Sequence, residues 1–289
     1  MAHTLLDWLI KRYPTAKRQT LKRMVEAGRV SVNARPARTL KDPLAEGDAV
    51  AVDERPAARV PVMPAGLRIV FEDADILVVD KPTGLLTSTT PRELRPTLLA
   101  KVREYVLANE PRARVGLIHR LDRDASGLLI FSKSDLAYQS LKTQFYQHTV
   151  RREYTAVVQG TPQAPKGRIE SNLVERTDGS VHSTRQIGKG EVAITQYEVL
   201  KSAGGLSLLR VNLKTGRKHQ IRVHLSERST PIIGDSVYGN EQKLAPRLML
   251  AATRLVIQHP RDGKELAFEI PMPGEFGTWD VSLKRGTEP

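Results

Sequence analysis

The sequence of 289 residues contains no cysteine and no long hydrophobic run. Without cysteine the chain has no disulfide, no thiolate metal ligand and no cysteine nucleophile. No apolar stretch approaches the roughly 18 residues of a membrane-spanning helix, and Met1–Pro14 lacks the apolar core of a secretion signal. We therefore expect a globular cytoplasmic protein without a membrane partner.

Acidic residues are few relative to basic ones. The chain has 45 Lys and Arg against 32 Asp and Glu, which gives a net charge of +13. Residues 1–41 contain ten basic and two acidic residues, so a net charge of +8 lies in this segment. Because Lys and Arg neutralise phosphates, this distribution predicts a polyanionic partner such as RNA.

Two short helices followed by short strands are predicted at the amino-terminal end. Apolar residues recur at helical spacing in residues 5–9 and 21–25, and the segments 30–32 and 50–52 alternate as strands do. A basic face lies beside the apolar stripe of the second helix and extends to Arg29 if the helix runs that far. We predict RNA contacts on this face, although a solvated charged face is an equally good interpretation. The predicted contacts are Arg18, Lys22 and Arg29.

Three prolines without helical or strand periodicity mark residues 55–66 as a linker. The linker separates a small domain at residues 1–54 from a larger one at residues 67–275. In the larger domain, short apolar runs alternate with turn signals and with helical patterns. Residues 276–289 are expected to form a loosely held tail.

The most informative stretch is residues 116–133, GLIHRLDRDASGLLIFSK. Its apolar ends are predicted strands, and five ionisable residues lie between them, before a Ser-Gly turn. A charged loop at the ends of buried strands can present reactive groups on a rigid scaffold. Taken alone, such a loop is more often a solvated turn with ion pairs.

Within this stretch, residues 119–127, HRLDRDASG, resemble the HRLDxxTSG motif of the RluA-type pseudouridine synthases. Ala125 departs from the motif, because the family usually has Thr there and the hydroxyl is lost. Further segments of the family recur in order over nearly the whole chain. They are VVDKPTGLL (78–86), REYTAVVQG (152–160), TGRKHQIRVHL (215–225) and GDSVYG (234–239).

The resemblance implies roles for five residues of the larger domain. Asp122 falls on the position of the family's catalytic aspartate, and Arg222 on that of the basic residue that pairs with it. Tyr154 corresponds to the tyrosine that stacks on the target base, although its strand pattern alone favours a core residue. Arg120 corresponds to a residue that enters the RNA. Lys81 belongs to a segment that shapes the cleft, where we expect it to bind RNA.

Pseudouridine formation breaks the bond between the ribose and a uracil nitrogen and rejoins the base through carbon 5. A carboxylate must act as nucleophile or as base toward the ribose, and both roles stay open for Asp122. A carboxylate buried beside a base needs a neighbouring cation, which Arg222 would supply. The target uridine must first be flipped out of the RNA. We expect no metal and no organic cofactor, because the spacing and companions of His219 and His224 do not suit zinc.

The expected fold also comes from the resemblance. The larger domain should be α+β, with a mixed, largely antiparallel sheet, flanking helices and a cleft along one face of the sheet. Residues 221–225 alternate as in a strand, whereas the family has a helix here, and we follow the family. The amino-terminal domain resembles the small S-four-type RNA-binding domain, with Ala34 where a Gly commonly follows Asn33. We expect a monomer.

The leading hypothesis is an RNA pseudouridine synthase, an isomerase, that acts on large-subunit (23S) ribosomal RNA, as relatives with this amino-terminal domain commonly do. Transfer RNA is the alternative substrate. A second hypothesis is a ribosome-associated RNA-binding protein without catalysis, and the intact set of Asp122, Tyr154 and Arg222 speaks against it. A third is a glycosidase with Asp122 and Asp124 as its carboxylates. Two residues so close in one loop give no reason to expect the separation that a glycosidase needs.

Overall fold

The computed structural model describes residues 3–26, 28–45, 47–53, 66–89, 96–240 and 244–277. The chain divides into two compact units, Met1–Val62 and Met63–Pro289. Apart from Gly66, the predicted linker lies outside the described residues, and so does the predicted tail beyond Gly277. Each unit has its own β-structure and its own core.

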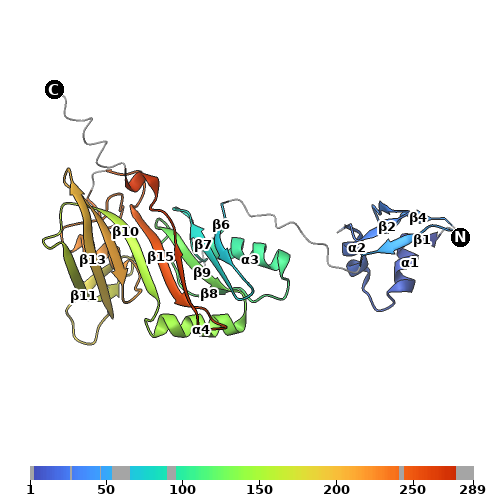
Figure 1. Cartoon of the computed structure of the whole chain (residues 1–289), viewed down its shortest axis with the longest axis horizontal. Coiled ribbons are helices and arrows are strands. Elements are labelled where there is room, and N and C mark those ends of the chain that lie inside the picture. Colours follow the sequence, from blue (N-terminus) through green and yellow to red (C-terminus); the bar gives the residue numbers. More distant parts are fainter. Residues whose placement is uncertain are drawn as a thin grey trace, which may run out of the picture. The chain divides into compact units, whose positions relative to one another are not determined.

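The amino-terminal unit contains two helices and two small sheets (Figure 1). Its elements are β1 (His3–Thr4), α1 (Leu5–Arg12), α2 (Arg18–Glu26), β2 (Val30–Val32), β3 (Arg35–Pro36), β4 (Pro43–Leu44) and β5 (Val50–Val52). Strand β1 pairs with β4, and β2 lies between β3 and β5. The helically spaced apolar residues Leu5, Leu9, Leu21 and Val25 form the core together with Val30 of β2. Helix α2 ends at Glu26, so Arg29 lies beyond it, and the face predicted along the helix holds only Arg18 and Lys22.

The second unit is built on an eleven-stranded sheet. The strands are β6 (Arg68–Glu72), β7 (Ile76–Lys81), β8 (Gly116–Leu117), β9 (Ser126–Ser132), β10 (Arg151–Gln159), β11 (Lys166–Glu175), β12 (Val181–Thr184), β13 (Glu191–Ala203), β14 (Leu206–Leu213), β15 (Leu250–Gln258) and β16 (Glu265–Glu269). Their order is β12-β11-β13-β14-β10-β15-β9-β7-β6, with β16 on β15 and β8 on β9. Every pairing is antiparallel except that of β15 with β9. This confirms the predicted mixed, largely antiparallel sheet.

Helices α3 (Leu98–Asn109) and α4 (Asp135–Tyr146) cover opposite faces of the sheet around β7 and β9. On one face Leu77, Val79, Leu129 and Phe131 share a core with α3. On the other face Ile76, Val78, Leu128 and Ile130 share a core with α4. Alternate side chains of a strand point to opposite faces, so these strands are apolar throughout.

A glycine at the end of the polar loop allows the loop to lie at the centre of the sheet. Gly127 has φ 110°, and a Cβ there would lie 2.2 Å from the carbonyl oxygen of Ala252, so only glycine allows β9 to approach β15 this closely.

Helix α5 (Gln220–Ser226) confirms the helix expected from the resemblance. A short 3₁₀ helix, η1 (Gly274–Phe276), follows β16. None of the helices in the described ranges has the length and apolar composition of a membrane span.

The hairpin between β2 and β3 carries local strain that we expect a single substitution to relieve. Its two-residue loop, Asn33 and Ala34, has φ of 50° and 63°, as in a type I′ turn. Asn33 tolerates this conformation, whereas the Cβ of Ala34 opposes it. We predict that Ala34→Gly raises the free energy of unfolding of the amino-terminal unit by about 0.5–1 kcal/mol. Guanidinium unfolding followed by Trp8 fluorescence, in a chain with Trp279→Phe, measures this change.

The matched control for this prediction is Ala51→Gly. Ala51 is an exposed residue of β5 without a positive φ, so glycine there should lower stability by up to about 1 kcal/mol. Loss of stability in both variants would contradict the interpretation of Ala34 as a strained residue.

Candidate active site

The polar loop 119–125 connects β8 with β9 and borders an open cleft of about 590 Å³. The loop, α4, β10 and α5 all contribute residues to the lining of this cleft. Among them are four of the residues predicted from the sequence: Arg120, Asp122, Tyr154 and Arg222. Elements that are far apart in the sequence therefore bring these four side chains to one place.

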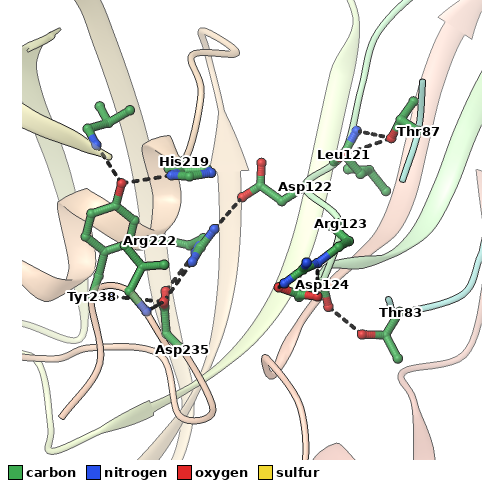
Figure 2. A network of polar contacts seen from close by, with 12 residues as sticks. Thr83, Thr87, Leu121, Asp122, Arg123, Asp124, His219, Arg222, Asp235 and Tyr238 are labelled. Carbon is green, nitrogen blue, oxygen red and sulfur yellow. Dashed lines mark hydrogen bonds and ion pairs between the residues drawn. The ribbon is translucent and has the colours of Figure 1, made fainter. Parts of the chain in front are cut away.

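Side chains from the segment after β7 form hydrogen bonds with the backbone of this loop. Thr87 Oγ1 donates to the carbonyl of Leu121 at 2.7 Å and accepts its N–H at 3.2 Å. Thr83 Oγ1 donates to the carbonyl of Asp124 at 2.6 Å, as Figure 2 shows. These bonds lie on either side of Asp122, so they fix the backbone that carries its carboxylate.

Lys81 completes this support, and it is not placed to contact RNA. Its side chain is 0% exposed, and its Nζ donates to three carbonyl oxygens at 3.0, 2.7 and 2.8 Å, those of Pro82, Leu85 and Arg123. Burial lowers the pKa of Lys81 to about 8, while the charges of Asp124 and Asp122 act in the opposite direction. The predicted RNA contact at Lys81 is therefore corrected, because its ammonium group is buried and donates its hydrogen bonds to backbone carbonyls.

Arg222 of α5 lies between two carboxylates (Figure 2). Its Nη1 is 3.2 Å from Oδ2 of Asp122, whose side chain is 24% exposed. Its Nε and Nη2 donate to the two oxygens of Asp235 at 2.7 and 2.8 Å. Burial alone would lower the pKa of Arg222, but Asp235 and Asp122 raise it above its ordinary value. The guanidinium is thus fixed by Asp235 and presents its remaining edge to Asp122.

Asp235 is the residue of this network that the sequence did not assign to the site. It lies in the GDSVYG segment, and its Oδ1 also accepts the N–H groups of Val237 and Tyr238 at 2.9 and 3.0 Å. Burial would raise the pKa of Asp235, but Arg222 and these N–H groups hold it below its ordinary value. No sequence pattern marks this role, because only the folded structure shows that the Arg222 guanidinium is buried and therefore needs a second counter-charge besides Asp122.

His219 and Tyr238 form a second layer of contacts around Arg222. The Tyr238 hydroxyl accepts the N–H of Val181 at 2.7 Å and lies 2.8 Å from Nδ1 of His219. Burial lowers the pKa of His219, so its imidazole is neutral and can accept a hydrogen bond from the Tyr238 hydroxyl. The Tyr238 ring centroid is 5.1 Å from Cζ of Arg222, which restricts the guanidinium further.

Tyr154 and Arg120 differ in their exposure to the cleft. Tyr154 is 5% exposed, and burial raises its pKa, so its phenol is protonated at neutral pH. Arg120 is exposed at the cleft border. The other predicted RNA contacts, Arg18, Lys22 and Arg29, belong to the amino-terminal unit. Over the described part of the chain, no three His, Cys, Asp or Glu side chains gather as metal ligands would.

Known proteins are similar to this chain in sequence and in fold. The family described as RNA pseudouridylate synthase matches residues 75–227. The chain is 34% identical over 284 residues to "Ribosomal large subunit pseudouridine synthase D" of Neisseria meningitidis, with 93% of this chain and 75% of the relative covered. A protein of the same name from Pseudomonas aeruginosa is 37% identical over 241 residues, with 76% and 72% covered. The solved structure of human RNA pseudouridylate synthase domain containing 4 has a TM-score of 0.63 at 24% identity and covers 75% of this chain and 93% of its own, which supports the fold.

The pair between Arg222 and Asp235 leads to a prediction about stability. Because the folded-state pKa of Asp235 is depressed, its contribution is complete above its ordinary pKa of about 3.9 and is lost as pH falls through the folded-state value. We predict that Asp235→Asn lowers the free energy of unfolding by about 3–5 kcal/mol at pH 7, since it leaves a buried cation with one partly exposed partner. Urea unfolding of both proteins between pH 7 and pH 3 measures the difference, which should shrink below about pH 4.

Glu191→Gln provides the control, because Glu191 is 66% exposed and pairs with Arg217 at 2.6 Å. An exposed pair of this kind contributes about 0–1 kcal/mol, so the variant should unfold almost as the wild type does. Equal losses in the two variants, or a loss in Asp235→Asn that does not vary with pH, would show that the buried pair is not the cause.

Proposed function

Because the chain belongs to the RNA pseudouridylate synthase family, we propose that it isomerises specific uridines of large-subunit ribosomal RNA with Asp122 as the catalytic carboxylate. The family assigns the reaction class, an isomerisation of uridine in RNA. The observation that carries the residue assignment is the position of Asp122, on a braced loop at an open cleft and 3.2 Å from a buried arginine. A glycosidase needs two carboxylates across a sugar, and Asp124 instead pairs with Arg123 at 2.9 Å.

The isomerisation moves the ribose from a ring nitrogen to carbon 5 of the same uracil, with no redox change. Asp122 either attacks the anomeric carbon or removes a proton from the ribose, and both roles need a fixed carboxylate oxygen within reach of the sugar. Arg222 donates to Oδ2 of Asp122 and so leaves Oδ1 available to the substrate. The contribution of the protein is then mainly positioning and electrostatic.

Access to the uridine requires that it leave the base stack. Flipping costs a few kcal/mol, and stacking on an aromatic ring returns about 1–3 kcal/mol per base. Tyr154 is the aromatic residue that β10 contributes to the cleft lining, and Asp122 lines the same cleft. Tyr154 therefore supports the flipped base, while the exposed Arg120 is free to enter the space that the base leaves.

The ribosomal target rests on the relatives. Two relatives at 34% and 37% identity carry the name of a large-subunit pseudouridine synthase. The amino-terminal unit, with its helices, short strands and excess of positive charge, would serve as an S-four-like RNA-binding domain. Its exposed Arg18 and Lys22, together with Arg29, would raise affinity through phosphate contacts and would not take part in the chemistry.

A pseudouridine map of ribosomal and transfer RNA tests this proposal. The map is made from cells with and without the gene, complemented by the wild type or by Asp122→Asn. We predict that specific pseudouridines of large-subunit RNA vanish in the deletion and return only with the wild type, because the amide can neither attack nor deprotonate the ribose. If pseudouridines vanish only from transfer RNA, transfer RNA is the substrate. An unchanged map, with binding of ribosomal RNA retained, would favour the non-catalytic RNA-binding protein.

A further inference from the structure

Arg152 of β10 is a partly buried cation without an acidic partner. Its Nε is buried and has no hydrogen-bond acceptor, and no carboxylate of the described residues pairs with its guanidinium. Its ring contact is with Phe145, whose centroid is 5.4 Å from Cζ. Burial lowers the pKa of Arg152. The guanidinium therefore has hydrogen-bonding capacity and charge that the protein itself does not use.

Among the described residues of this unit, the other buried cations are compensated. Lys133 pairs with Glu72 and Glu110 at 2.7 and 2.6 Å, and Arg222 lies between two aspartates. Lys81 donates to three carbonyl oxygens. Desolvation of an uncompensated charge is unfavourable, so Arg152 is destabilising in the protein without ligand. An anion that enters the cleft would remove that cost.

The surroundings of Arg152 suit an anion. Lys142 of α4 lines the same cleft, and its Nζ makes only a 3.5 Å contact, with the carbonyl of Ile118. Burial and the nearby charges of Arg152 and Lys142 together lower the pKa of His119 to about 3, so this corner is electropositive. A Cβ on Gly216 would lie 2.5 Å from Nη1 of Arg152, so the guanidinium lies directly against the backbone at this glycine and a side chain there would displace it.

We propose that Arg152, assisted by Lys142, forms a subsite for the backbone phosphate that adjoins the flipped uridine. This inference rests on the proposed function. Arg152 and Tyr154 are two residues apart on one strand, so their side chains point to the same face about 7 Å apart. A nucleotide whose base lies on Tyr154 therefore brings its neighbouring phosphodiester to Arg152. Guanidinium binds phosphate oxygens with two parallel hydrogen bonds, which fixes the ribose relative to Asp122.

Binding to short single-stranded RNA with one uridine tests the subsite. Each phosphodiester is replaced in turn by an uncharged methylphosphonate, and dissociation constants are measured for the full-length wild type and for Arg152→Gln. We expect one replacement beside the uridine to weaken wild-type binding by about tenfold, the size of a charge-assisted hydrogen bond. Arg152→Gln should weaken binding of the unmodified RNA by a similar factor and should be insensitive to that one replacement.

Arg151→Gln is the matched control, because Arg151 precedes Arg152 on β10, is exposed, and pairs with Glu265 at 2.6 Å. It removes the same charge and should keep the wild-type response to every replacement. If Arg152→Gln also keeps that response, or if no replacement weakens the wild type selectively, the subsite is refuted. A melting temperature of Arg152→Gln at or above that of the wild type supports a ligand-binding role, whereas a lower one with unchanged RNA binding indicates a structural role.

The binding measurement needs no turnover, so it separates the two proposals. If the wild type isomerises no RNA while the response to the replacement depends on Arg152, the proposed function fails and the anion subsite stands. If uridines are isomerised and Arg152→Gln behaves as Arg151→Gln does, the proposed function stands and the subsite fails.

Discussion

The site depends on one buried guanidinium, that of Arg222, held between Asp235 and Asp122. Asp235 takes two of its donors and is itself fixed by backbone N–H groups, so the third donor points to Asp122 without freedom to rotate. Helix α5, which carries Arg222, has only seven residues and is anchored by polar side chains. Gln220 bonds to Thr215 and to the carbonyl of Ile194, at 2.7 and 3.0 Å. A helix this short is not stable in isolation, and these hydrogen bonds stabilise it as a rigid support for Arg222.

The charged residues of the cleft form two groups with different roles. The carboxylate of Asp122 lies on a loop whose backbone is held by buried groups, and the buried cations beside it, Lys81 and Arg222, are compensated by the protein. Arg152 and Lys142 lie on the side of the cleft formed by β10 and α4, where their charges are left for a ligand. In our proposals the first set performs the chemistry on the ribose and the second places the RNA backbone, so binding and reaction use different residues of the same cavity.

The motif and strand patterns predicted much of this arrangement, and the failures have physical causes. Alternation at residues 221–225 suggested a strand, but every residue from Gln220 to Leu225 is buried, so the pattern carried no information about one exposed face. Lys81 is the last residue of β7 and precedes a turn, where a lysine is normally solvated, and only the folded turn shows that three carbonyls converge on its ammonium. Asp235 was missed because no periodicity shows that its loop folds back onto α5.

The most direct test of Asp122 as the reacting group is tritium release from RNA labelled at carbon 5 of the target uridine, measured with enzyme in excess. The new bond forms at this carbon, so its hydrogen must pass to water, and release follows the reaction itself. We expect Asp122→Asn to bind the RNA and release no tritium. We expect Asp235→Asn to release it slowly, at unchanged RNA affinity, because Arg222 loses its anchor. Release by Asp122→Asn at the wild-type rate would contradict the assignment of this carboxylate.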